Sequence, residues 1–81
     1  MRRNDLDICA DILKVAQTGA KKTQIVYQAN LNFKIVKKYL SRLIEKELLD
    51  PANDRRYYTT TSRGVDFIDR YGALVTPLKG M

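Results

Sequence analysis

The sequence has no histidine, a single cysteine, two prolines and four glycines. The absence of histidine removes both the commonest metal ligand and the commonest general base of enzymes. One cysteine cannot form an internal disulfide. Cys9 lies on the apolar side of an expected helix beside Ile12 and Leu13, which favours a buried small side chain over a reactive thiol. We therefore expect no metal, no cofactor and no disulfide.

Long apolar runs are also missing. No run of about eighteen apolar residues occurs, so no segment is expected to span a membrane. The basic start of the chain is followed by acidic residues rather than by the apolar core of a signal peptide. We expect a cytoplasmic protein of one domain over residues 1–81, because this length leaves little room for a second core.

The net charge of +6 is unevenly distributed along the chain. The segment from Lys21 to Arg63 contains ten of the fifteen Lys and Arg residues but only four of the nine Asp and Glu residues. Cations and acids balance outside this segment, so the segment accounts for the whole excess. A basic middle between neutral ends predicts one surface that faces an anionic partner.

Two helices are expected before the third, most basic one. The first spans about residues 6–18, with Asn4 or Asp5 as its N-cap and Gly19 as its stop. A short basic connector follows. Thr23 can then cap a second helix over about residues 24–29. Its core contacts are expected to include Ile25, Val26 and Tyr27.

The third helix, over about residues 32–46, has two distinct faces. Asn32 is a good N-cap, and Asn30 before it tolerates the left-handed backbone of a tight turn. The apolar stripe consists of Val36, Tyr39, Leu40, Leu43 and Ile44. The opposite side carries Lys34, Lys37, Lys38, Ser41 and Arg42. Two helices joined so tightly predict a helix-turn-helix, although a helical hairpin in a bundle has the same features.

The segment after this helix separates the two possibilities. A bundle would continue with another amphipathic helix, whereas residues 48–50 are a short apolar run and residues 51–54 have turn chemistry. Residues 55–60 are rich in aromatic and β-branched side chains, which favour a strand. The pattern predicts a β-hairpin with a basic tip, a wing, in which Arg55 and Arg56 can reach a phosphate backbone or a minor groove.

The last element is a helix over about residues 62–78, capped by Thr61 or Ser62. Its possible dimerisation seam consists of Ile68, Tyr71, Val75 and Leu78. Gly72 lies inside the helix and Pro77 disfavours helix at the preceding residue, so a short dimer contact is expected rather than a long coiled coil. The expected fold is mainly α with a small β-hairpin: a winged helix-turn-helix with three helices, a two-stranded wing and a C-terminal helix.

With these elements in order, the chain resembles the small archaeal winged-helix regulators and the related chromatin proteins that dimerise through a C-terminal helix. The resemblance is carried by residues 29–33, by the Tyr39-Leu40 and Leu43-Ile44 pairs, and by residues 58–64, and it extends from about Asp5 to Tyr71. It implies a homodimer that binds double-stranded DNA. Two departures are Glu47, where such proteins often have glycine, and the shortness of the C-terminal helix.

The expected function is DNA binding as a transcriptional regulator, with the third helix in the major groove and the wing on the backbone or minor groove. The residues expected to contact DNA are Lys21, Lys22, Thr23, Gln24, Asn32, Lys34, Lys37, Lys38, Ser41, Arg42, Arg55 and Arg56.

Three alternatives compete with a regulator. Non-specific packing of chromatin would use the same basic surface. A winged-helix protein-interaction module would expose an apolar or acidic docking face, which the concentrated positive charge opposes. An enzyme is disfavoured, because Asp50 and Asp54 flank a turn and Ser41 has no histidine to activate it.

Overall fold

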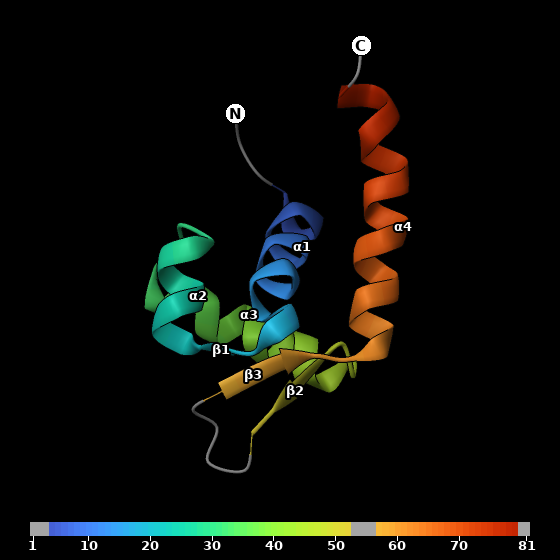
Figure 1. Ribbon diagram of the computed structural model, residues 1–81. Helices are drawn as coiled ribbons and strands as arrows, with labels where there is room; N and C mark the ends of the chain where they lie inside the picture. Colours follow the sequence, from blue (N-terminus) through green and yellow to red (C-terminus); the bar gives the residue numbers. More distant parts are fainter. Residues whose placement is uncertain (1–3, 53–56, 80–81) are drawn as a thin grey trace.

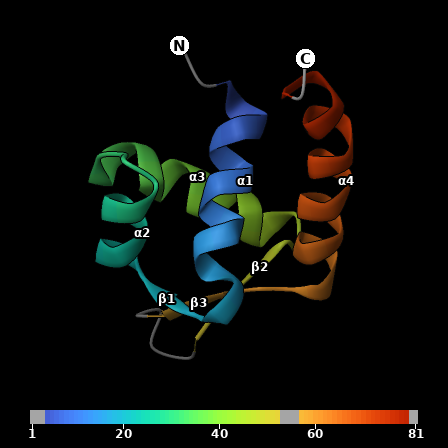
Figure 2. The same cartoon turned by 45° about the horizontal axis from the view of Figure 1, so that its top comes forward.

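The computed structural model describes residues 4–52 and 57–79, with side chains described up to Leu74. Its elements are α1 (Asp5–Val15), the 3-10 helix η1 (Ala16–Thr18), β1 (Ala20–Lys21), α2 (Lys22–Gln28), α3 (Phe33–Glu45), β2 (Leu49–Pro51), β3 (Tyr57–Thr60) and α4 (Ser62–Lys79). α1 lies between α2 and α4, α3 crosses behind it, and the strands close one end (Figures 1 and 2). The expected winged helix is confirmed.

α1 begins where the sequence predicts, with Asn4 as its N-cap. The Asn4 side chain accepts a hydrogen bond from the Asp7 backbone N–H at 2.8 Å, and the Asp7 carboxylate accepts one from the Asn4 backbone, which is a capping box. α1 ends at Val15, one turn of 3-10 helix follows, and Gly19 then takes a φ of +89°. Glycine reaches this region without the steric cost that a Cβ atom would bring.

The connector after Gly19 differs from the sequence-based prediction. Ala20 and Lys21 form a strand that pairs antiparallel with β3, so the sheet has three strands in the order β1-β3-β2. α2 consequently begins at Lys22, and its cap residue makes no side-chain hydrogen bond. The prediction of Thr23 as an N-cap is wrong, because the extended backbone ends two residues earlier and Thr23 lies inside the helix. Ile25 and Val26 are buried as expected, but Tyr27 is 83% exposed, so its prediction as a core contact is wrong.

The core forms where the helices meet the sheet. Its fully buried large side chains are Ile12, Leu13, Ile25, Val36 and Leu49, which come from α1, α2, α3 and β2. The buried Thr60 hydroxyl of β3 donates to the Leu13 carbonyl of α1 at 2.6 Å, which ties the sheet to the first helix. Cys9 is half-buried against this core, and burial raises the pKa of its thiol.

Two left-handed residues set the direction of α3. Asn30 has a φ of +55° in the turn before it, and Asn32 caps it by accepting from the Ile35 backbone N–H at 2.8 Å. Glu47, with a φ of +61°, ends it. The Glu47 carbonyl accepts from the Thr61 hydroxyl, and its carboxylate accepts from Arg63, both at 2.7 Å. These bonds hold an ordinary side chain where glycine is usual.

α4 begins as expected, because the Thr61 hydroxyl accepts from the Gly64 backbone N–H at 3.1 Å. The helix then continues through Pro77 to Lys79, although a proline was expected to disfavour it there. Proline in the final turn removes one backbone donor but leaves the preceding turns intact. The molecule measures 43 × 26 × 19 Å, and the far half of α4 projects beyond the other elements (Figure 1). Within the described ranges, no helix has the length and apolar character to cross a bilayer.

Candidate nucleic-acid interface

α3 presents the two faces that its sequence predicts. Its inward side consists of Val36, Tyr39, Leu40 and Leu43, all buried, with Ile44 half-buried at the edge. Its outward side consists of Lys34, Lys37, Lys38, Ser41 and Arg42, all exposed, and the capping residue Asn32 is exposed at its start. None of these five side chains is needed for the core, so α3 can offer them to a partner.

A polar contact fixes α3 against α1. The hydroxyl of Tyr39, inside the apolar stripe, donates a hydrogen bond to the carboxylate of Asp5. This hydrogen bond, followed by burial, raises the pKa of Tyr39 above its ordinary value. Because a hydrogen bond has directional requirements that apolar packing lacks, the pair sets how α3 is rotated about its own axis.

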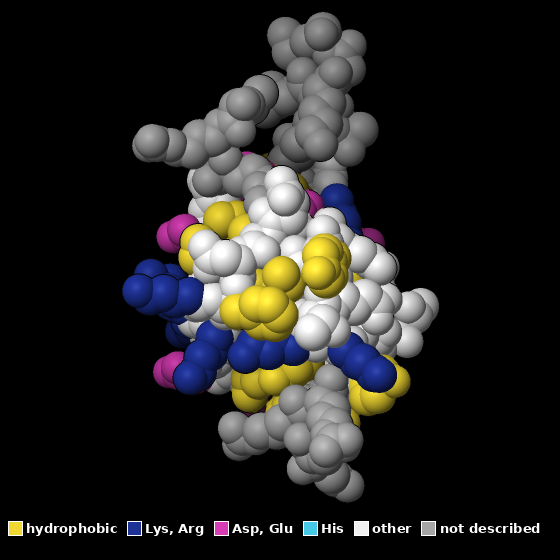
Figure 3. Space-filling view, turned by 90° about the vertical axis from the view of Figure 1, so that its left-hand side faces the viewer, with side chains coloured by type: hydrophobic (Ala, Val, Ile, Leu, Met, Phe, Trp, Pro, Cys, Tyr) yellow, Lys and Arg dark blue, Asp and Glu magenta, His cyan; other side chains and the backbone are white. Residues whose placement is uncertain are grey.

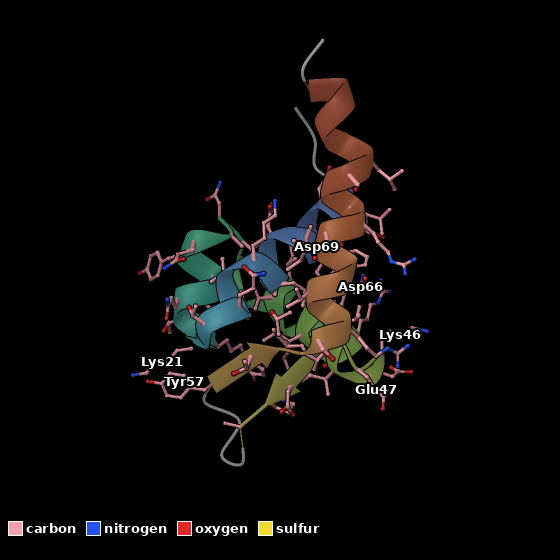
Figure 4. All side chains as sticks on the ribbon, turned by 45° about the vertical axis from the view of Figure 1, so that its right-hand side comes forward. Lys21, Lys46, Glu47, Tyr57, Asp66 and Asp69 are labelled. Atoms are coloured by element: carbon pink, nitrogen blue, oxygen red, sulfur yellow. The ribbon has the colours of Figure 1, made fainter. Side chains whose placement is uncertain are left out.

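The start of α2 lies beside the base of the wing. Lys21 of β1 is paired in register with Tyr57 of β3, and its ammonium nitrogen lies 5.6 Å from the centroid of the Tyr57 ring. Figure 4 shows the two labelled side chains together at one end of the sheet. Tyr57 is 47% exposed, whereas Tyr58 beside it is buried, which confirms that alternate strand residues divide between surface and core. The pairing of β1 with β3 thus holds Lys21 beside the base of the wing.

Lys22 makes the corresponding contact with α3. Its ammonium nitrogen lies 6.0 Å from the centroid of the Phe33 ring, at the first position of that helix. Thr23 and Gln24 are exposed on the following turn of α2. The sequence-predicted residues at the start of α2 are therefore next to those of α3.

A hollow lies where α2, α3 and β3 meet. It is lined by Lys22, Lys37, Leu40, Ser41, Ile44 and Tyr58. Two lysines and a hydroxyl thus line one hollow together with apolar side chains and the Tyr58 ring. The candidate interface contains this hollow as well as the exposed cations of α3.

Lys and Arg side chains form a row across the face of the molecule that carries α2, and acidic side chains appear only at the margins of that face (Figure 3). Not every cation of the basic segment belongs to it. Lys46 and Glu47 lie at the end of the sheet away from Lys21 and Tyr57 (Figure 4), and Arg63 is paired with Glu47. The expectation that all the cations from Lys21 to Arg63 gather on one side is therefore too broad.

The predicted tip of the wing, with Arg55 and Arg56, lies outside the described residues. Strands β2 and β3 on either side of it pair antiparallel, with Leu49 opposite Thr60 and Pro51 opposite Tyr58. This pairing confirms the base of the expected hairpin. This base lies beside Lys21, next to the row of cations.

Sequence reasoning missed the exposed aromatic rings of this face. Phe33 is 50% exposed, although its position three residues before Val36 is typical of a core stripe. Tyr57 was assigned no role. Each ring lies against a lysine that comes from a different part of the chain, and this juxtaposition leaves no mark in the local sequence.

The predicted dimer seam on α4 needs one correction. Ile68 is only 8% exposed and belongs to the protomer's own core, so it has little surface for a partner. Tyr71 is half-buried and stacks on Phe67, with ring centroids 6.3 Å apart. The side chains of Val75 and Leu78 lie outside the described part of the chain. Leu74, which the seam omitted, is 74% exposed.

A tight helix pair, an amphipathic helix with an exposed basic face and a hairpin beside it define the winged helix-turn-helix class. Residues 2–77 match the winged helix-turn-helix family, and the chain belongs to that family. Among solved structures it is similar to Sso10a-2, a DNA-binding protein from Sulfolobus solfataricus. The sequence identity is 25%, the TM-score is 0.85, and the match covers 96% of this chain and 84% of that one. A comparison with curated proteins gives no significant match.

Proposed function

We propose that this protein binds double-stranded DNA as an archaeal transcriptional regulator, that it is cytoplasmic and associated with the nucleoid, and that it catalyses no reaction. The observation that carries the proposal is the exposed, basic outward face of α3, which continues into Lys21 and Lys22 at the start of α2. The winged helix-turn-helix family and the similarity to a DNA-binding protein support it.

In the proposed complex, α3 lies in the major groove. Lysine can donate to guanine acceptors and a hydroxyl can address several bases. The side chains that face base edges are therefore Lys34, Lys37, Lys38 and Ser41, with Asn32 and Arg42 at the margins. Lys21 and Lys22, with Thr23 and Gln24, meet phosphates beside the groove. The wing, with Arg55 and Arg56, then reaches the neighbouring backbone or minor groove. Phosphate contacts supply affinity and register, and base contacts supply sequence preference.

The proposed active species is a homodimer joined through α4. This helix projects from the body, and Leu74 is largely exposed near the half-buried Tyr71 on the projecting part. An exposed leucine beside an aromatic residue gains free energy when a second copy covers it. Two copies of α3 would then read two half-sites of one duplex.

The test is a binding titration with a matched charge control. Replacing Lys37 and Lys38 with alanine is expected to weaken binding and to reduce the slope of log affinity against log salt by about 1 for each lysine. The control replaces Lys46 and Arg63, which are exposed at the end of the sheet away from Lys21 and carry the same total charge. Its slope should remain close to that of the unaltered protein.

Equal losses in the two double variants would show that overall charge, and not this face, drives binding. The thermal melting temperature should be nearly unchanged by the Lys37 and Lys38 replacements, because both side chains are exposed. Comparing a random duplex with selected sequences separates the two DNA-binding roles. Equal affinity for every duplex would indicate chromatin packing, and one preferred site would indicate a regulator.

A further inference from the structure

Phe33 is an exposed aromatic residue at the leading end of α3. It is the first residue of the helix, and half of its surface is accessible to solvent. Its backbone position is fixed, because Asn32 immediately before it caps the helix through the Ile35 N–H. The core therefore does not account for a large apolar side chain at this point, whereas the leading turn of a recognition helix is where base contacts are made.

The Phe33 ring is oriented by a cation. The Lys22 ammonium nitrogen lies 6.0 Å from the ring centroid, within the range of a cation–π interaction. Lys22 also lines the hollow between α2, α3 and β3 together with Lys37 and Ser41. The ring thus lies against a lysine that also lines this hollow.

Helical spacing places the ring in line with two residues of the interface. Phe33, Lys37 and Ser41 follow one another at four-residue intervals, so they form a single ridge along α3. Hydrophobic side chains lie directly against the row of cations on this face (Figure 3). An apolar group on a ridge of hydrogen-bonding residues has a distinct partner in DNA, since the thymine methyl is the apolar group that a base pair presents in the major groove.

We propose that Phe33, oriented by Lys22, contacts the 5-methyl group of thymine and gives the protein a preference for thymine at the leading end of its site. The inference rests on the proposed DNA-binding function and adds a specificity-determining residue to it. The contact needs no hydrogen bond, because the methyl group and the ring remove apolar surface from water together.

The experiment compares two duplexes that differ only in this methyl group. One is a short duplex of alternating dA and dT, and the other has deoxyuridine in place of every dT, which leaves base pairing unchanged. The unaltered protein is expected to bind the thymine duplex more tightly, by roughly fourfold for each methyl group contacted. Phe33→Ala should bind both duplexes equally. Phe33→Leu, which stays apolar, should keep part of the preference.

The matched control is Ile35→Ala. Ile35 is 38% exposed on the same helix, two residues further on and therefore on another side of it. This variant should retain the full thymine preference. Altered stiffness of the deoxyuridine duplex would leave the preference in Phe33→Ala as well, so its loss in that variant alone assigns it to the methyl contact. Thermal melting of each variant confirms that it is folded.

Two outcomes would overturn the inference. Equal affinity of the unaltered protein for both duplexes would exclude a methyl contact while leaving DNA binding in place, and an undiminished thymine preference in Phe33→Ala would assign the contact to another residue. Failure to bind either duplex at low salt would instead contradict the proposed function itself. A contact with a protein partner predicts that Phe33→Ala leaves DNA affinity unchanged, which also overturns the inference.

Discussion

Tyr39 connects α3 to α1 with a specific polar bond. It is 6% exposed, and its hydroxyl donates to Asp5 of α1. The sequence places Tyr39 correctly in the apolar stripe. It does not reveal the bond, because the partner is 34 residues away and local periodicity carries no information on such a distance.

Replacing Tyr39 with phenylalanine is expected to lower the free energy of unfolding by roughly 1 kcal/mol, since Asp5 is exposed and can be solvated when its donor is lost. The raised pKa of Tyr39 adds a pH dependence. The folded state holds the phenolic proton more tightly, so the contribution is complete below the unfolded pKa of about 10 and falls as the pH rises through it.

Urea titrations of both proteins at neutral pH and above pH 10 check this prediction. The unaltered protein should lose more stability on the shift to high pH than Tyr39→Phe does. An identical loss in the two proteins would show that the Asp5 contact does not affect the titration of Tyr39.

Glu47 combines backbone strain with a surface ion pair. An ordinary residue in the left-handed region costs about 1 kcal/mol relative to glycine, whereas an exposed pair such as Glu47 with Arg63 contributes less than about 0.5 kcal/mol. Strain is the larger effect. We therefore expect Glu47→Gly to leave stability unchanged or to raise it slightly, by a few tenths of a kcal/mol up to about 1 kcal/mol.

Glu47→Gln serves as the control, because it removes the charge and keeps the strained backbone. Chemical denaturation should show a small loss for this variant. A loss of several kcal/mol in Glu47→Gly would mean that the side chain holds the turn after α3 together, contrary to the ranking of strain above the ion pair.

At the scale of elements, α4 contains two glycines with opposite roles. A Cβ atom at Gly64 would lie 2.3 Å from the Leu48 carbonyl oxygen and 2.5 Å from Thr60 Cγ2, whereas one at Gly72 would meet nothing within 4 Å. The first glycine allows α4 to approach the backbone before β2. The second is a half-buried helix position with open space for a Cβ atom, where alanine is intrinsically favoured.

Gly64→Ala is therefore expected to destabilise the fold by about 1–3 kcal/mol, because overpacking outweighs the better helix propensity. Gly72→Ala should stabilise it by up to about 1 kcal/mol. Denaturant unfolding of the two variants provides the comparison, and each serves as the control for the other. Stabilisation by both substitutions would show that the backbone near Leu48 yields without cost.

The elements that the sequence predicted correctly are those that are specified by residues close to one another in the chain. The cap at Asn32 and the two faces of α3 each depend on a few neighbouring residues, and both are confirmed. The pairing of β2 with β3 confirms the strands of the expected hairpin. β1 was missed because a strand of two residues has no periodicity and exists only through its pairing with β3. Phe33 was missed for the same reason, since its environment depends on Lys22 from another helix.

At the scale of the whole molecule, the basic face and the projecting helix come from different parts of the chain. The cations of the proposed interface lie on α2, α3 and the base of the wing, whereas the proposed contact between copies lies on the projecting part of α4. The sequence indicated this separation through the neutral composition outside Lys21–Arg63. It could not show that Ile68 turns inward, because an apolar seam looks the same whether it faces its own core or a second copy.

The separation allows dimerisation and DNA contact to be tested independently. About six phosphates neutralised by one protomer predict a slope of log affinity against log salt of roughly −5, and two protomers on one duplex predict about twice that value. Leu74→Asp places a charge on the exposed part of α4 without touching the cations of α3. If α4 joins two copies, this variant should sediment as a monomer and bind DNA with about half the slope of the unaltered protein. An unchanged mass together with an unchanged slope would show that this part of α4 does not join the two copies.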